Sequence, residues 1–100
     1  MTTATRLIVH ADDFGIAEPV NTGIVEAHDR GIVTSVSMLA NGPAFDHAVA
    51  LARSRPRLDI GVHLVLTEQR PLTDAPSLVD PSGRFVSHAT RLARERLRCA

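Results

Sequence analysis

The chain has 100 residues, of which 44% are hydrophobic, enough for at most one small domain with its own core. Eleven Lys and Arg residues balance eleven Asp and Glu residues, and this neutrality argues against nucleic acid or an anionic membrane surface as a partner. The single cysteine, Cys99, excludes an internal disulfide framework and a cysteine-built zinc site.

Predicted strands and helices alternate along the first two thirds of the chain. β-branched and apolar runs bounded by polar residues or turn signals predict three strands, over residues 6–11, 32–40 and 58–66. Apolar residues at helical spacing that follow a proline predict two helices, over residues 19–30 and 43–55. Strands joined by helices pair in parallel with right-handed crossovers, so the sequence predicts an α/β fold with a parallel β-α-β-α-β unit.

Side-chain periodicity assigns faces to these elements. The inward stripes of the two helices are expected at Val20, Ile24 and Ala27, and at Phe45, Ala48, Val49 and Ala52, with His47 exposed beside the second stripe. In the third strand, alternate residues from Ile60 to Leu66 form an apolar face suited to helices, which places His63 on the opposite face. Ser35 and Ser37 make one face of the second strand polar.

The last third of the chain carries weaker signals. Residues 67–83 contain three prolines and a glycine without a period, which predicts a long loop followed by a short extended piece over residues 84–86. Residues 88–98 are basic and predict a helix, whose arginines are typical of a solvated face. Three strands do not close a barrel, so one sheet edge and much of the helix-packing surface should be exposed.

The chemistry-bearing residues gather at the carboxyl ends of two strands. Asp12 and Asp13 are adjacent carboxylates that close the first strand, and His63 lies near the end of the third. Ligands of parallel α/β sheets collect at this edge. Taken singly, each signal has a structural explanation, because Asp pairs commonly start loops and strand histidines commonly form ordinary hydrogen bonds. Together they predict a shared site.

Oxygen and imidazole donors without a thiolate suit Zn²⁺, Mn²⁺, Co²⁺ or Mg²⁺. Such an ion polarises a carbonyl oxygen and lowers the pKa of a bound water. A carboxylate that does not bind the ion then serves as a general base. The residues therefore indicate metal-assisted hydrolysis, although two ligands fall short of the three that catalytic zinc sites commonly use.

Several segments resemble the YdjC-like carbohydrate deacetylases, and most closely their hopanoid-biosynthesis-associated subgroup. The similarity lies in Ala11-Asp12-Asp13-Phe14-Gly15, Asn21, Thr34-Ser35 with Ser37, Gly61-Val62-His63-Leu64, and later Val79-Asp80 with Gly83-Arg84-Phe85. The resemblance implies a (β/α) barrel that removes acetyl groups from N-acetylated sugars with a divalent metal, here Mg²⁺ or Zn²⁺.

Residue roles follow from the same resemblance. Asp13 and His63 would be metal ligands, Asp12 the general base, and Asn21 a substrate-binding residue near the site. Residues 1–100 would form a single partial domain, the N-terminal part of a longer enzyme whose further histidine ligand lies elsewhere. His10 stands where a small polar residue is expected and is interpreted as packing beside the site.

Two other functions remain open from the sequence. A receiver-type signalling domain also has an acidic pair after its first strand, but it needs a later lysine, and this chain has none. A non-catalytic fragment or sugar-binding module of the same fold is the stronger alternative. For either enzyme or module we expect an N-acetylated sugar or glycolipid as partner and a homo-oligomer as assembly. Without a signal peptide or membrane span, the expected location is the cytoplasm.

Overall fold

The computed structural model describes residues 3–86, which divide into two compact units, the first ending at residue 63 and the second beginning at residue 64. The helices and strands found in this part of the chain all belong to the first unit. In chain order they are β1 (His10–Phe14), α1 (Glu18–Asp29), β2 (Ser35–Leu39), α2 (Phe45–Arg53) and β3 (Asp59–His63). The predicted alternation of strands and helices is confirmed, and the helix predicted over residues 88–98 lies outside the described residues.

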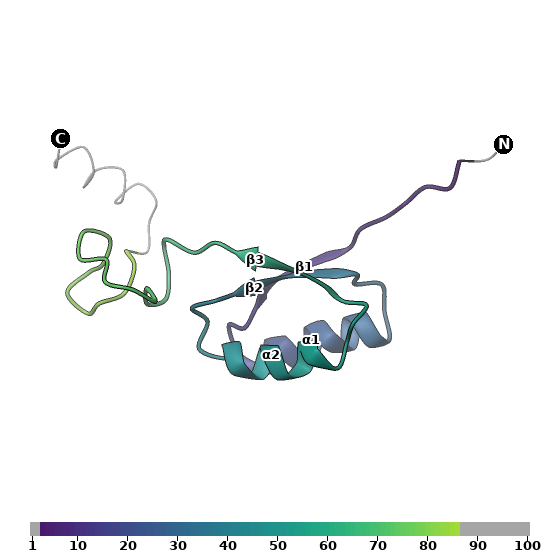
Figure 1. Cartoon of the computed structure of the whole chain (residues 1–100), viewed down its shortest axis with the longest axis horizontal. Coiled ribbons are helices and arrows are strands. Elements are labelled where there is room, and N and C mark those ends of the chain that lie inside the picture. The colour runs from purple at the N-terminus through teal and green to yellow at the C-terminus, as the bar shows by residue number, and fades with distance from the viewer. Residues whose placement is uncertain (1–2, 87–100) are drawn as a thin grey trace. The chain divides into compact units, whose positions relative to one another are not determined.

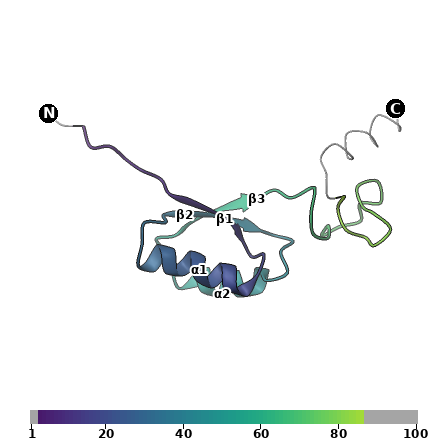
Figure 2. The same cartoon turned by 180° about the vertical axis from the view of Figure 1, so that it is seen from behind.

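The three strands form one parallel sheet in the order β1-β2-β3 (Figure 1). Both helices lie on the same face of this sheet, α1 packing on β1 and α2 on β2 (Figures 1 and 2). The core between the two layers joins Phe14 and Val36 of the sheet to Ile24, Val25 and Ala48 of the helices. The predicted α/β class and parallel pairing are therefore confirmed, whereas a barrel stays a prediction that three strands do not test.

The ends of the strands differ from the prediction because backbone pairing, rather than apolar character, decides where each begins and stops. Leu7 and Ile8 precede β1 and are 74% and 77% exposed. The ladder starts only at Val9, whose carbonyl oxygen accepts hydrogen bonds from the next segment. At the other edge, the last pair of the β2–β3 register ends at His63, so Leu64 and Leu66 lie beyond the strand and are exposed.

The apolar side of β3 faces the helix layer without being covered by it. Ile60 and Val62 are register partners of Val36 and Met38, which places them on the helix side of the sheet. They are nevertheless 49% and 73% exposed, because neither α1 nor α2 lies over β3. The expectation that helices pack on this strand is wrong for the described residues, and the expected exposure of an edge is confirmed.

The inward faces of the helices also differ from prediction at two positions. Val20 is 40% exposed, and the buried residues of α1 are Asn21, Ile24 and Val25. In α2, His47 is partly buried and its Nδ1 lies 3.1 Å from Asn21 Nδ2, so its predicted exposure is wrong. Both differences have one cause, because Asn21 finds hydrogen-bond partners inside the unit and therefore takes an inward position that periodicity reserves for apolar residues.

Residues 64–86 form the described part of the second unit and contain turns rather than helices or strands, which agrees with the loop predicted over residues 67–83. One antiparallel bridge joins Val79, in the predicted loop, to Phe85, in the predicted extended piece. Between them, the Asp80 carboxylate accepts hydrogen bonds from the backbone N–H groups of Ser82 and Arg84 and from the Ser82 hydroxyl. These bonds hold the pKa of Asp80 below its ordinary value, and the hydrogen bond from the Ser82 side chain has the largest effect.

Candidate functional site

A β-bulge in β1 directs both acidic side chains to the same side of the sheet. Three steps along β1, from Ala11 to Phe14, match only two steps along β2. Asp13 absorbs the extra residue with a φ of 63°, in the left-handed region that non-glycine residues seldom adopt. Ala11 and Phe14 therefore both pack into the core, while Asp12 and Asp13 are exposed away from it. Simple alternation would have sent one of the two acids toward the helices.

The bulge brings Asp13 to the end of β3. Asp13 Oδ1 lies 3.4 Å from Nε2 of His63, the last residue of that strand. Their side chains are 52% and 31% exposed, so both donor atoms remain accessible to a ligand from solvent. The structure thus brings together the two residues that the sequence proposes as metal ligands, 50 positions apart in the chain.

Asp12 has a different imidazole beside it. Asp12 Oδ1 lies 3.5 Å from Nε2 of His10. The His10 ring is held over β2, with Nδ1 2.7 Å from the Ser35 hydroxyl oxygen and Nε2 2.6 Å from that of Ser37. Sequence patterns assigned His10 no function. The signal was present, however, because alternation places His10 on the same polar face as Ser35 and Ser37.

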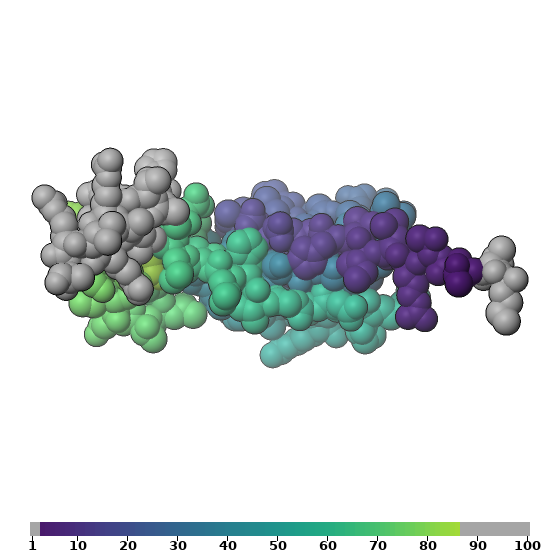
Figure 3. Space-filling model, turned by 90° about the horizontal axis from the view of Figure 1, so that it is seen from above, coloured from purple at the N-terminus to yellow at the C-terminus, as the bar shows by residue number. Residues whose placement is uncertain are grey.

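This polar face is the one that the helices leave open. Figure 3 looks onto it from above, with the purple β1 segment and the green β3 segment at the surface. The polar side chains on this face are His10, Ser35 and Ser37 in the hydrogen-bonded cluster and His63 at the end of β3, which confirms the polar face predicted for the second strand.

Asn21 lies behind the acidic pair and is fully buried. Its Oδ1 accepts a hydrogen bond of 2.7 Å from the Gly15 N–H, and its Nδ2 donates to the Ala44 carbonyl oxygen at 3.0 Å. The second Nδ2 hydrogen is directed to His47 Nδ1. One side chain thus joins the loop after β1 to the loop after β2, and its polar atoms are occupied by these neighbours.

The two loops approach each other closely at glycines. Gly15 has a φ of 110°, and a Cβ there would lie 3.2 Å from the Leu39 carbonyl oxygen. A Cβ on Gly42 would collide with the Gly15 carbonyl oxygen, which already accepts a 2.8 Å hydrogen bond from the Ala44 N–H. The chain therefore turns sharply at Gly15, and this turn sets the orientation of the chain immediately after the acidic pair.

Within residues 3–86, no three His, Cys, Asp or Glu side chains converge closely enough to form a complete metal site. Asp13 and His63 supply two donors of the types that Mg²⁺ and Zn²⁺ use. The described residues therefore fit part of a metal site, whose completion needs at least one more ligand.

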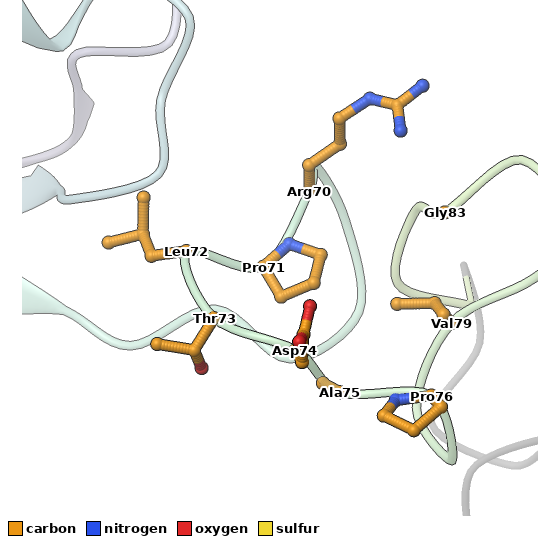
Figure 4. A pocket seen from close by; sticks show the side chains of 9 residues that line it. All are labelled: Arg70, Pro71, Leu72, Thr73, Asp74, Ala75, Pro76, Val79 and Gly83. Atoms are coloured by element: carbon orange, nitrogen blue, oxygen red, sulfur yellow. The ribbon is translucent and has the colours of Figure 1, made fainter.

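The second unit holds a separate open pocket of about 630 Å³. Its lining residues are Arg70, Pro71, Leu72, Thr73, Asp74, Ala75, Pro76, Val79 and Gly83. In Figure 4, Asp74 and Val79 point toward Pro71, whereas Leu72 points away. None of the predicted site residues lines this pocket, and it brings no acid and imidazole together.

Comparison with known proteins shows one family over nearly the whole chain. The sequence profile described as "YdjC-like protein" matches residues 6–99. A carbohydrate deacetylase of Brevibacillus brevis is 54% identical over 81 residues, which are 80% of this chain and 33% of that protein. A carbohydrate deacetylase of Geobacillus stearothermophilus is 54% identical over 78 residues, which are 78% of this chain and 32% of that protein.

A solved structure shows the same relation in three dimensions. A protein from Enterococcus faecalis, described as a putative cellobiose-phosphate cleavage protein, superposes with a TM-score of 0.80 at 45% sequence identity. The match covers 88% of this chain and 36% of that protein. The chain therefore spans about a third of the length of the relatives that it matches.

Proposed function

The chain belongs to the YdjC-like family, and from this membership we propose that it carries part of the active site of a metal-dependent hydrolase that removes acetyl groups from N-acetylated carbohydrates. One observation carries the proposal: Asp13 and His63, from the ends of two strands, lie 3.4 Å apart on an accessible edge. The names of its relatives, carbohydrate deacetylases, supply the substrate class.

The separation of the two donor atoms supports a shared ion. Two ligand atoms about 2.1 Å from one ion at tetrahedral positions lie about 3.4 Å apart. Asp13 Oδ1 and His63 Nε2 have this separation. Octahedral Mg²⁺ would need about 3.0 Å between adjacent ligands, a small adjustment for exposed side chains. We propose Zn²⁺ or Mg²⁺, with a third protein ligand from a part of the enzyme beyond the described residues.

Asp12 is the general base in this proposal. Asp12 is adjacent to the proposed ligand Asp13 in the chain but lies beside the His10 imidazole instead of His63. Because its side chain is 67% exposed, its carboxylate is available to a water molecule. Asp13 and His63 would hold a divalent ion, which would supply polarisation of the acetyl carbonyl group. Asp12 accepts a proton from the attacking water, a C–O bond forms at the acetyl carbon, and the C–N bond breaks. Asp12 then passes that proton to the nitrogen of the leaving amine, which gives acetate and the free amino sugar.

Asn21 contributes to substrate binding indirectly in this scheme. Because its side chain is fully buried, it shapes the substrate side of the site through the backbone of Gly15 and Ala44, which it holds. Closure into a (β/α) barrel, a place in the hopanoid-biosynthesis-associated subgroup, a glycolipid substrate, a homo-oligomer and a cytoplasmic location remain predictions. Among the described residues, none of the helices combines the length and the apolar character that crossing a membrane requires.

Calorimetric titration of the chain with Zn²⁺ and with Mg²⁺, combined with an acetate-release assay on N-acetylated sugars, tests the proposal. Asp13→Ala and His63→Ala should weaken metal binding by more than the about 10- to 100-fold that loss of an outer-shell partner costs. Asp12→Ala should retain the metal and lose turnover. Asp46→Ala, which removes an acid from the first turn of α2, is the control and should change neither. Equal metal affinity in all four variants would contradict the ligand assignment.

The alternative is a non-catalytic fragment or sugar-binding module of the same fold. Within residues 3–86, Asp13 and His63 offer two ligand side chains, fewer than the three that catalytic zinc sites commonly use, and this observation favours the alternative. Metal or sugar binding by the chain without acetate release would support it. Acetate release that depends on Asp12 would support the hydrolase.

A further inference from the structure

The His10 ring is held at both of its nitrogen atoms on the open face of the sheet. These atoms lie 2.7 and 2.6 Å from the hydroxyl oxygens of Ser35 and Ser37. The register places His10 beside Ser35, and the two serine contacts hold the ring against β2 although its side chain is 41% exposed. Hydrogen-bond partners at both ring nitrogens fix the orientation of the His10 ring, which apolar packing alone would not do.

The two serines can hold the ring whichever nitrogen carries the proton. A hydroxyl group donates one hydrogen bond and also accepts, so each serine adapts to an N–H or to a bare ring nitrogen. The ring therefore keeps its place through a change of tautomer or of protonation. Ser35 and Ser37 form a clamp whose effect is to fix the position of Nε2.

That nitrogen is the one that faces Asp12. Nε2 lies 3.5 Å from Asp12 Oδ1, and the Asp12 side chain is 67% exposed. The neighbouring Asp13 is directed to His63 at 3.4 Å. Each of the two adjacent carboxylates thus lies beside a different imidazole, that of His10 for Asp12 and that of His63 for Asp13.

We propose that His10, clamped by Ser35 and Ser37, is a positioning residue that holds the Asp12 carboxylate apart from the Asp13–His63 pair. This division leaves Asp13 free to bind an ion and keeps Asp12 as the base. The part of the inference that concerns the reaction rests on the proposed function. The part that concerns the orientation of Asp12 does not.

The orientation is measurable by NMR on the metal-free full chain. Three-bond couplings to Cγ report the χ1 rotamers of Asp12 and Asp13. In the wild type, Asp12 couplings should show one dominant rotamer, and in His10→Ala they should approach the values of a freely averaging side chain. Asp13 couplings should not change. His28→Ala, which removes an imidazole from the last turn of α1, is the matched control and should leave Asp12 ordered.

A second variant guards against a failure of His10→Ala to fold. Ser37→Ala releases the clamp at Nε2 and keeps the imidazole, and it should loosen Asp12 to an intermediate degree. His10→Gln retains a hydrogen-bond donor and should restore part of the order. Asp12 couplings that stay at wild-type values in His10→Ala and Ser37→Ala would overturn the proposal.

Kinetics then separate this inference from the proposed function. If the chain releases acetate, His10→Ala should lower kcat about 10-fold through misplacement of the base, with KM and metal affinity unchanged. A fall in metal affinity with an unchanged kcat would overturn the positioning role. If no variant releases acetate while Asp12 loosens in His10→Ala, the proposed function fails and the positioning of Asp12 stands.

Discussion

The two faces of the sheet are built from alternate residues of the same three strands, yet they differ in what they do. On the helix side, Phe14 and Val36 are fully buried in the core. On the open side, His10, Ser35 and Ser37 form a hydrogen-bonded cluster at the surface. One face supplies apolar burial and the other supplies groups that can bind and exchange protons.

This difference shows how a short fold can keep chemistry separate from stability. Apolar burial is the main favourable term in folding, and exposed polar contacts contribute little. Regular alternation would send one of the adjacent residues Asp12 and Asp13 to the core side. The β-bulge at Asp13 prevents this, so both carboxylates lie on the open side. Substitutions on the helix side should therefore mainly lower the free energy of unfolding, whereas substitutions on the open side should mainly change the site.

The largest effect should come from Phe14→Ala. Phe14 is fully buried at the end of β1, and its truncation leaves a cavity between the sheet and both helices. We expect the free energy of unfolding to fall by about 3–5 kcal/mol, measured by urea denaturation. Ser35→Ala, on the open face of β2, is the matched control and should cost about 1 kcal/mol or less. A cost for Ser35→Ala as large as that of Phe14→Ala would remove the contrast between the faces.

Asn21→Ala should rank second. Asn21 is a polar residue on the core side, and its loss leaves the Gly15 N–H and Ala44 carbonyl groups without this partner. We expect a loss of about 1–3 kcal/mol in the free energy of unfolding, from urea curves. Hydrogen exchange at the Gly15 amide should accelerate in the same variant.

The neighbouring Thr22 provides the control for Asn21. Its side chain is exposed and bonds within α1, to the Glu18 carbonyl oxygen. Thr22→Ala should change stability by no more than about 0.5 kcal/mol. If Asn21→Ala is equally mild, the two loops are held together by something other than this amide.

Much of the fold could be predicted from the sequence, because alternation of apolar runs and turn signals is local information. Strand ends were predicted poorly because they depend on partners. Leu7 and Ile8 are as apolar as any strand residue, but backbone pairing begins only at Val9. Likewise, the apolar face of β3 predicted a covering helix, and none of the described helices reaches Val62.

The site could be predicted in part for a similar reason. Strand topology alone indicates that Asp13 and His63 meet at one edge, and the structure brings them within 3.4 Å. The bulge at Asp13 is invisible to a period-two pattern, because an extra residue leaves no compositional signal. The clamp on His10 was missed because each serine–histidine contact depends on the register between two strands.

Two glycines of the first unit differ in backbone conformation and in the space around them, so alanine substitutions at the two positions should have opposite effects on stability. Gly15 has a φ of 110° and lies against the loop after β2. Gly23 lies in α1 with open space around its missing Cβ. Gly15→Ala should destabilise the chain by about 1–2 kcal/mol because of its left-handed backbone. Gly23→Ala should stabilise it by about 0.5–1 kcal/mol. Thermal or urea unfolding measures both, and the same sign for the two variants would contradict the contrast between a strained turn and an open helix position.

The smallest effect concerns a charged pair on the helix layer, away from both faces of the sheet. Arg55 donates hydrogen bonds to both carboxylate oxygens of Asp29, with Nη2 2.7 Å from Oδ2. The hydrogen bond from Arg55 holds the pKa of Asp29 below its ordinary value. A lowered folded-state pKa favours the carboxylate form, so the stabilisation is present above the ordinary Asp pKa and is lost as the pH falls through the lowered value.

Asp29→Asn should therefore reduce stability slightly near neutral pH and make the difference from wild type disappear in acid. Urea midpoints recorded from about pH 6 to about pH 2 measure this difference, because the lowered pKa lies below the ordinary value. Arg55→Ala should abolish the same pH-dependent difference, and adding Asp29→Asn to it should contribute no further acid dependence, because the two side chains act as one pair. The NMR couplings of Asp12 should be unchanged in both variants. A difference from wild type that persists undiminished in acid would show that Asp29 stabilises the helices by something other than its charge.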